Sequence, residues 1–149
     1  EAQFDVLRLA RGMTYKSAVA DTGLGGGKAI ILGNPKTDKT DALFHAMGEF
    51  IDALGGTYIT AEDVGTSVED MVQVRQKTRW VTGLPRAMGS SGDPSPWTAL
   101  GVFRGQKACL EDVFGTGDFT GRTVAIQGVG HVGAPLAQVV TNRRRSASQ

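Results

Sequence analysis

The sequence predicts an α/β fold in two parts, an α/β domain followed by the start of a second one. Three observations support this prediction. Short apolar runs alternate with amphipathic helical patterns over residues 1–82. Residues 83–94 are dense in Gly, Ser and Pro, which predicts a connector between domains. Residues 95–149 then bring a glycine motif between a strand pattern and a helical pattern.

The first part alternates three helical patterns with three short strand patterns. Apolar spacing predicts helices over residues 2–20, 39–54 and 66–78, and apolar or β-forming runs predict strands over 29–32, 57–60 and 80–82. Thr66 and Glu69 match a capping box at the start of the third helix. The loop that contains Asp63 follows the second strand, and α/β sheets bind ligands at such carboxyl ends.

The second part opens with a helix that Ser95 is predicted to cap, with Pro96 at its first position and Gly115 at its end. A strand is predicted over residues 123–127. Directly after it come Gly128, Gly130 and Gly133, and then a helical pattern that ends near residue 142.

This G-x-G-x-x-G spacing between a strand and a helix is the dinucleotide fingerprint of a Rossmann domain. Its glycines permit a tight turn and let a pyrophosphate approach the helix N-terminus. His131 and Val132 occupy variable positions of the motif and are predicted to lie beside the nucleotide.

Composition narrows the class of protein. The 149 residues carry a formal net charge of +1, so the sequence predicts no nucleic-acid partner and no membrane surface. The single cysteine excludes an internal disulfide and indicates a reducing cytoplasm. The 21 glycines are about twice the usual share, which is typical of a loop-rich α/β enzyme.

The two ends predict a piece of a longer protein. Glu1 already lies inside a helical pattern, and residues 143–149 form a polar tail without helical periodicity. A complete Rossmann unit has a second strand with an acidic residue about 20 positions after the glycines. The tail does not match that strand, so we expect a truncation or a shifted reading frame after the first strand, turn and helix.

Two lysines flank the most glycine-rich segment. Gly25, Gly26 and Gly27 precede Lys28, and Lys16 lies upstream in the first helix. A phosphate-binding P-loop is excluded, because Ala29 stands where that motif needs Ser or Thr. Two lysines in one cleft would lower each other's pKa, and one could then act as an acid or base. The alternative is that both are solvated surface residues.

Three segments carry a resemblance to a known family: ARGMTYKSAVADTGLGGGK, YITAEDVGTSVEDM and GSSGDPSPWTALGVFRGQKA. Together they closely resemble the glutamate/leucine/phenylalanine/valine dehydrogenases, over nearly the whole chain. The segment Gly23-Leu24-Gly25-Gly26-Gly27-Lys28-Ala29 and the TAEDVGT loop are more similar to the leucine branch than to the glutamate branch.

The resemblance implies a role for each matching residue. Lys28 would be the catalytic lysine that activates water, and Asp63 would shuttle protons to and from the amino group. Lys16 would hold the substrate carboxylate, with Met13, Gly26 and Gly27 also in the substrate site. Thr98 would contact the nicotinamide amide of NAD, and the residues of the glycine motif would bind the rest of the cofactor, namely Gly128, Gly130, His131, Val132 and Gly133.

The implied reaction is the reversible, NAD-dependent oxidative deamination of an L-amino acid to its 2-oxo acid and ammonia. A branched aliphatic substrate is expected, with phenylalanine or valine as alternatives. A homo-oligomer and no metal site are also expected. The contrasting hypothesis is an inactive remnant, or a binding or assembly module without catalysis.

Overall fold

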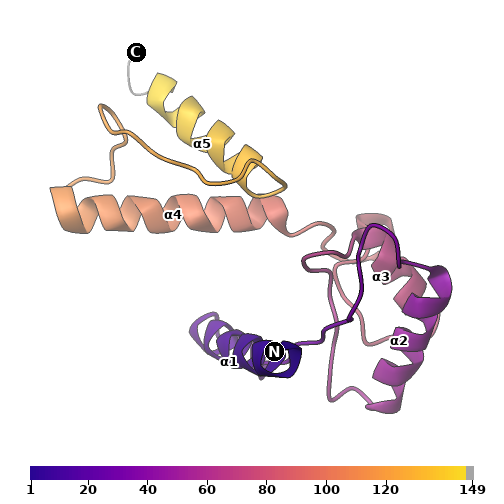
Figure 1. The fold of residues 1–149 in the computed structure, drawn as a ribbon. Coiled ribbons are helices and arrows are strands. Elements are labelled where there is room, and N and C mark those ends of the chain that lie inside the picture. The colour runs from indigo at the N-terminus through magenta and orange to yellow at the C-terminus, as the bar shows by residue number, and fades with distance from the viewer. Residues whose placement is uncertain (147–149) are drawn as a thin grey trace. The chain divides into compact units, whose positions relative to one another are not determined.

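The computed structural model describes residues 1–146. The chain divides into two compact units, the first spanning Glu1–Gly92 and the second beginning at Asp93 (Figure 1). Each unit has its own apolar core. Leu84 belongs to the first core, so part of the segment with connector composition packs within unit 1.

Unit 1 contains three α-helices and one turn of 3₁₀ helix. They are α1 (Ala2–Val19), α2 (Asp41–Ala53), α3 (Val68–Arg75) and η1 (Arg86–Met88). Thr40 caps α2, because its side chain accepts a hydrogen bond of 3.2 Å from the Leu43 N–H. The three helices lie within the ranges that apolar spacing predicts.

The capping box of α3 is not the predicted one. Ser67 is the N-cap, its hydroxyl accepts from the Asp70 N–H at 3.3 Å, and the Asp70 carboxylate accepts from the Ser67 N–H at 2.8 Å. The predicted pair of Thr66 and Glu69 has the same spacing one residue earlier, and the Thr66 hydroxyl bonds to Asp63 instead. The prediction of that pair was wrong because the pattern fits both registers.

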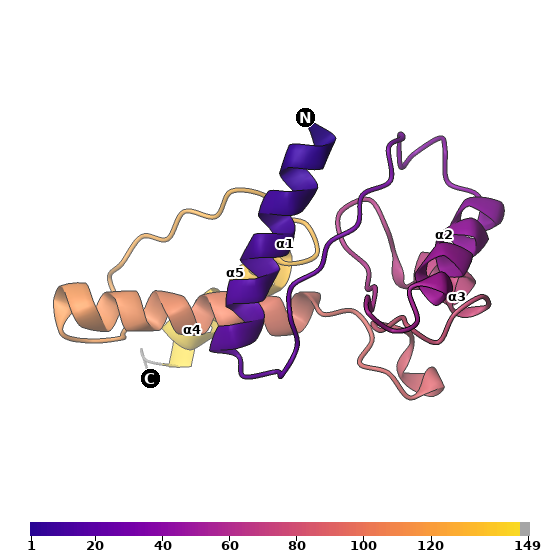
Figure 2. The same ribbon diagram turned by 90° about the horizontal axis from the view of Figure 1, so that it is seen from below.

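Helices α2 and α3 lie side by side in both ribbon views (Figure 2) and contribute most of the core of unit 1. Ile51 and Val74 are fully buried at this contact. Gly48 allows the close approach, since a Cβ there would lie 2.7 Å from the Val74 carbonyl oxygen. The core of this unit comprises Phe44, Ile51, Met71, Val74, Val81 and Leu84.

The predicted strands of unit 1 are not formed as strands. Between residues 1 and 92, β pairing is limited to one isolated parallel bridge, Thr60 with Val81. The Thr60 N–H donates to the Trp80 carbonyl at 3.0 Å, and the Thr82 N–H donates to the Thr60 carbonyl at 2.8 Å. The run 29–32 has no paired neighbour, and Leu32 is 77% exposed. A strand requires a hydrogen-bonded partner, so apolar β-formers alone do not create one.

Unit 2 contains α4 (Ser95–Phe114) and α5 (Gly133–Ser146), which pack against each other. Gly115 ends α4 with φ of 71°, the left-handed conformation that glycine adopts without strain. The predicted cap at Ser95 was wrong: Pro94 is the N-cap, Ser95 is helical, and the Ser95 N–H donates to the Asp93 carboxylate at 2.8 Å. None of the helices described in residues 1–146 is long and apolar enough to cross a membrane.

The segment between α4 and α5 returns along α4 to the start of α5 (Figure 1). Residues 123–127, predicted as a strand, lie in this segment without β pairing. Val124 and Ile126 nevertheless pack against the core formed by Ala99, Phe103, Phe119, Leu136 and Val140. Phe103 and Phe119 stack there with ring centroids 5.2 Å apart. Alternate side chains thus face the core, as the period of a strand predicts.

The polar tail departs from its prediction in part. Helix α5 continues to Ser146, beyond the end that apolar spacing predicts. Residues 147–149 of the predicted tail lie outside the described residues. A helix can continue past its apolar pattern because arginine has a high helix propensity.

Gly48→Val should lower the free energy of unfolding of unit 1 by about 1–3 kcal/mol, the usual cost of overpacking. The new Cβ would lie 2.7 Å from the Val74 carbonyl oxygen and 2.8 Å from Lys77 Cβ. Urea unfolding followed by Trp80 fluorescence measures this in a Trp97→Phe background, since Trp80 packs on the core of unit 1. As a control, Gly12→Ala has no atom within 4 Å of the new Cβ and should stabilise α1 by about 0.5–1 kcal/mol. Equal effects of the two substitutions would contradict the packing argument.

Candidate functional site

Two glycines bring Lys28 against the rest of unit 1. A Cβ on Gly26 would lie 2.1 Å from the Thr14 nitrogen and 2.3 Å from the Ala10 carbonyl oxygen, so the backbone of residue 26 rests directly on α1. A Cβ on Gly27 would lie 2.7 Å from the Tyr58 ring. Lys28 therefore follows a backbone held between α1 and the segment of Tyr58, where no larger residue fits.

Lys28 forms an ion pair with Asp63. The Lys28 Nζ contacts the Asp63 Oδ2 atom, and the two residues come from segments that lie far apart in the sequence. The Lys28 side chain is 22% exposed and the Asp63 side chain 53%. The structure thus brings together the two residues for which the sequence predicts acid and base chemistry.

The pKa of Lys28 lies below its ordinary value of 10.5. Burial is the larger cause, because the protonated amine loses water, and the positive charge of Lys16 is the second. A carboxylate in contact with an amine favours its protonated form, so removal of the Asp63 charge is expected to lower the pKa of Lys28 further. A lysine with a lowered pKa spends more of its time as a free base, which a proton acceptor near neutral pH requires.

Lys16 and Met13 stand on the last turns of α1. Lys16 is exposed and Met13 is half-buried. The charge of Lys16 acts on Lys28, which links two of the predicted site residues electrostatically. The exposed Lys16 ammonium makes no ion pair with the described residues, so it is free to bind a carboxylate.

Sequence reasoning missed two residues at this site. Tyr58 contacts the backbone at Gly27. The Thr66 hydroxyl lies 2.8 Å from both the N–H and the carbonyl oxygen of Asp63. The signal for Thr66 was the pattern of a threonine three residues after an aspartate, typical of a hydrogen-bonded turn, but the same threonine also fits a helix cap.

The glycine motif of unit 2 forms a tight turn directly before α5. Gly128 has φ of 87°, which few other residues adopt. A Cβ on Gly133 would lie 2.0 Å from the Gly128 carbonyl oxygen, so the first turn of α5 rests on the turn before it. Gly130 has no atom within 4 Å of a Cβ position, which leaves open space at the start of α5. A pyrophosphate needs this combination of tight turn and bare backbone.

The other residues predicted to bind the nucleotide also lie in unit 2. His131 is exposed, and Val132 is half-buried against the core. Thr98 is exposed in the first turn of α4, where its hydroxyl donates to the Pro94 carbonyl at 3.1 Å. A threonine hydroxyl that donates within its own helix still has lone pairs with which to accept from a ligand amide.

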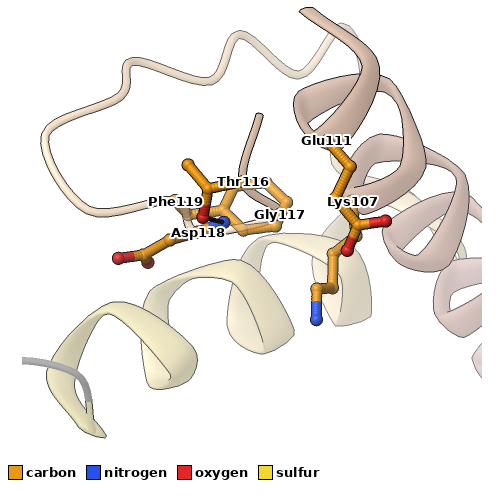
Figure 3. Close-up of a pocket in the computed structure, with 6 residues that line it drawn as sticks. All are labelled: Lys107, Glu111, Thr116, Gly117, Asp118 and Phe119. Atoms are coloured by element: carbon orange, nitrogen blue, oxygen red, sulfur yellow. Dashed lines mark hydrogen bonds between the residues drawn. The ribbon is translucent and has the colours of Figure 1, made fainter. Parts of the chain in front are cut away.

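A cavity of about 320 Å³ lies elsewhere in unit 2 (Figure 3). Lys107 and Glu111 project from α4 toward the loop that follows this helix, and atoms of both side chains lie next to Gly117. None of the predicted site residues lines this cavity, so it is separate from the candidate site. Its lining is Lys107, Glu111, Thr116, Gly117, Asp118 and Phe119.

The first part of the chain matches the model of a known protein family. Residues 1–80 match the family model described as "Glu/Leu/Phe/Val dehydrogenase, dimerisation domain". The chain belongs to the Glu/Leu/Phe/Val dehydrogenase family. The match covers α1, α2, α3, Lys28 and Asp63, so the ion pair lies within the part of the chain that matches the family model.

Curated relatives and a solved structure extend the similarity within this family. The leucine dehydrogenase of Thermoactinomyces intermedius is 56% identical over 95% of this chain and 39% of the relative. The phenylalanine dehydrogenase of the same organism is 48% identical over 94% of this chain and 38% of the relative. The crystal structure of L-tryptophan dehydrogenase from Nostoc punctiforme has a TM-score of 0.68 and 41% identity, over 96% of this chain and 39% of that chain. The chain thus spans about two fifths of the length of these relatives.

Lys16→Gln should raise the pKa of Lys28 toward its ordinary value of 10.5, because the substitution removes a positive charge. The pKa stays below that value, since burial persists. In the original chain the unfolded state binds more protons than the folded state between the lowered pKa and 10.5, so the stability of unit 1 rises with pH over this window. The variant should show a smaller rise.

A pH titration of the Lys28 side-chain NMR signals measures this pKa, and urea unfolding at several pH values measures the stability. Lys36→Gln is the control, because Lys36 is an exposed lysine elsewhere in unit 1. An unchanged Lys28 titration in the Lys16 variant would show that the two lysines do not interact.

Proposed function

We propose that this protein catalyses the NAD-dependent oxidative deamination of a branched-chain aliphatic L-amino acid to its 2-oxo acid and ammonia. The observation that carries the proposal is the ion pair between Lys28 and Asp63, with the pKa of the lysine lowered by burial and by Lys16. Leucine dehydrogenases at 56% and 55% identity support the choice of substrate.

The proposed chemistry assigns one task to each side chain of unit 1. Lys16 holds the substrate carboxylate as a cation at the end of α1. The Lys28 Nζ, as a free base, takes a proton from the water that attacks the iminium carbon, which forms once the substrate carbon has lost its hydride. The Asp63 Oδ2 atom accepts protons from the substrate amino group and returns them to the departing ammonia. The contact between Lys28 and Asp63 lets a proton pass between the two atoms.

NAD, when bound, accepts the hydride from the substrate carbon. We assign its pyrophosphate to the turn of Gly128, Gly130 and Gly133 at the start of α5, since Gly130 leaves space there and a helix N-terminus attracts anions. Thr98, His131 and Val132 complete the proposed set. In this assignment residues 1–82 are the substrate domain, 83–94 the connector, and 95–149 the start of a Rossmann domain.

The proposal includes a homo-oligomer in the cytoplasm. The matched family model is named as a dimerisation domain. Helix α1 exposes Phe4 by 71%, Leu7 by 64% and Val19 by 89%, apolar surface of the kind that subunit contacts bury. The single cysteine of the sequence suits a reducing compartment.

Two alternatives have specific support. Phenylalanine dehydrogenases at 48% and 47% identity favour an aromatic substrate at the same site. The family model matched by residues 1–80 is described as a dimerisation domain, which favours a binding or assembly module without catalysis. Substrate binding and turnover must therefore be measured separately.

The 2-oxo acid of leucine should bind unit 1 and perturb the backbone NMR signals of Gly26, Lys28 and Asp63. Lys16→Met should weaken this binding by roughly tenfold or more, the value of a charge-assisted hydrogen bond to the carboxylate. Titration of isotope-labelled chain measures the affinity, and Lys36→Met serves as the control. Tighter binding of the 2-oxo acid of phenylalanine would overturn the choice of an aliphatic substrate.

NADH formation from L-leucine and NAD tests the reaction itself. Lys28→Met should lower the rate by roughly a hundredfold or more, the usual loss when a general base is removed. Binding without NADH formation would favour the non-catalytic alternative. An undiminished rate in the Lys28 variant would remove this lysine from the mechanism.

Gly130→Ala should weaken NAD binding by roughly tenfold while the thermal stability of unit 2 stays the same, because the new methyl meets no protein atom within 4 Å but occupies the proposed pyrophosphate space. Isothermal titration with NAD and a thermal melt measure the two quantities. Gly105→Ala, in the interior of α4 with equally open surroundings, is the control and should leave NAD affinity unchanged. Equal affinities for both variants would place the cofactor elsewhere.

A further inference from the structure

We propose that Thr66 is a positioning residue for Asp63: its hydroxyl fixes the backbone of Asp63 so that one carboxylate oxygen faces Lys28. This inference rests on the proposed function, because it concerns the same site. It adds a residue that acts through Asp63 and takes no part in the proton transfer itself.

The Thr66 hydroxyl forms hydrogen bonds with both backbone polar groups of Asp63. Its Oγ1 atom accepts from the Asp63 N–H at 2.8 Å and donates to the Asp63 carbonyl oxygen at 2.8 Å. The Thr66 N–H also donates to that carbonyl, at 2.9 Å. Three hydrogen bonds therefore restrain the peptide groups on either side of the Asp63 Cα atom, which sets the direction of its side chain.

The two carboxylate oxygens of Asp63 then have different partners. The Val64 N–H donates to Oδ1 at 2.7 Å, and Oδ2 contacts the Lys28 amine. Because the Asp63 side chain is 53% exposed, neighbouring side chains exclude few rotamers. The restrained backbone and the bond to Val64 supply the order that packing does not.

The loop that carries Thr66 is tied to two helices. Thr66 directly precedes Ser67, the N-cap of α3, whose N–H donates to Asp70 at 2.8 Å. The same Asp70 oxygen accepts from the Lys39 amine at 2.5 Å, next to the N-cap of α2. Thr66 therefore connects the capped start of α3 to Asp63, and a displacement of Asp63 would have to break the hydrogen bonds to Thr66.

A hydroxyl that only stabilised the loop would leave the Lys28 amine unaffected. A hydroxyl that directs Asp63 toward Lys28 changes how the amine titrates, and only while Asp63 carries its charge. The Lys28 titration separates these two roles without any turnover, so it does not depend on catalysis by the chain.

The experiment is a double-mutant cycle read on the Lys28 side-chain NMR titration. Thr66→Val and Asp63→Asn should each lower the pKa of Lys28, because the amine loses its negative neighbour. The double variant should show no larger shift than Asp63→Asn alone, since Thr66 acts only through Asp63. Thr66→Ser keeps the hydroxyl and should titrate like the original chain.

Two further variants complete the design. Thr66→Ala, measured alongside Thr66→Val, guards against disturbance by the branched side chain, and Trp80 fluorescence checks that unit 1 stays folded. Thr120→Val is the matched control, because the Thr120 hydroxyl also forms a hydrogen bond with an aspartate: it donates to Asp118 Oδ1 at 3.0 Å in unit 2. It should leave Lys28 unchanged.

Three results would each overturn the assignment of Thr66. They are additive shifts of the Lys28 pKa in the double variant, a Thr66→Ser variant that titrates like Thr66→Val, and no shift of the Lys28 pKa in Thr66→Val or Thr66→Ala. NADH formation is measured separately in the same variants, and there Thr66→Val should lower kcat by roughly tenfold or more with little change in KM, the effect of a misplaced catalytic group. Absent NADH formation with an intact cycle would overturn the proposed function and leave the positioning role in place.

Discussion

The site depends on the direct contact between the backbone of Gly26 and α1. A Cβ at residue 26 would lie 2.1 Å from the Thr14 nitrogen, so only glycine lets the chain approach the helix this closely. From that contact follow the partial burial of Lys28 and its proximity to the charge of Lys16. The glycine run first invites interpretation as a phosphate cradle, but its role here is to bring a lysine to a helix and to Asp63.

Each unit stabilises its helices through a core of its own. In unit 1, Phe44 and Ile51 of α2 meet Met71 and Val74 of α3. In unit 2, α4 and α5 pack against each other and enclose Phe119 from the segment between them. Amphipathic helices gain most of their stability from such burial, and this explains why their ranges follow from apolar spacing. The extended runs gain much less, since β pairing among the described residues is limited to Thr60 and Val81.

The catalytic candidates of unit 1 lie in the part of the chain that matches the family model. The matched family model covers residues 1–80, which contain Lys16, Lys28 and Asp63, while the glycine motif of unit 2 lies beyond it. The relatives act on leucine, phenylalanine or tryptophan by name, so their similarity supports an amino-acid dehydrogenase more firmly than it supports one side chain. In the proposed mechanism, Lys28 and Asp63 act on the part of an amino acid that all these substrates share.

The sequence by itself determined the helices, the two-part organisation of its patterns, and the residue types at the site. These are local properties: apolar periodicity, glycine and proline positions, and motif spacing depend on neighbours in the chain. Tertiary structure alone decided the pairing of Lys28 with Asp63, the register of the α3 cap at Ser67, and the failure of residues 29–32 and 123–127 to form strands. Each of these depends on a partner distant in sequence or on competition between two equal patterns. A strand needs a hydrogen-bonded neighbouring strand, and the pKa of a lysine shifts when its side chain is buried. Both depend on contacts with distant residues, which one segment of sequence does not specify.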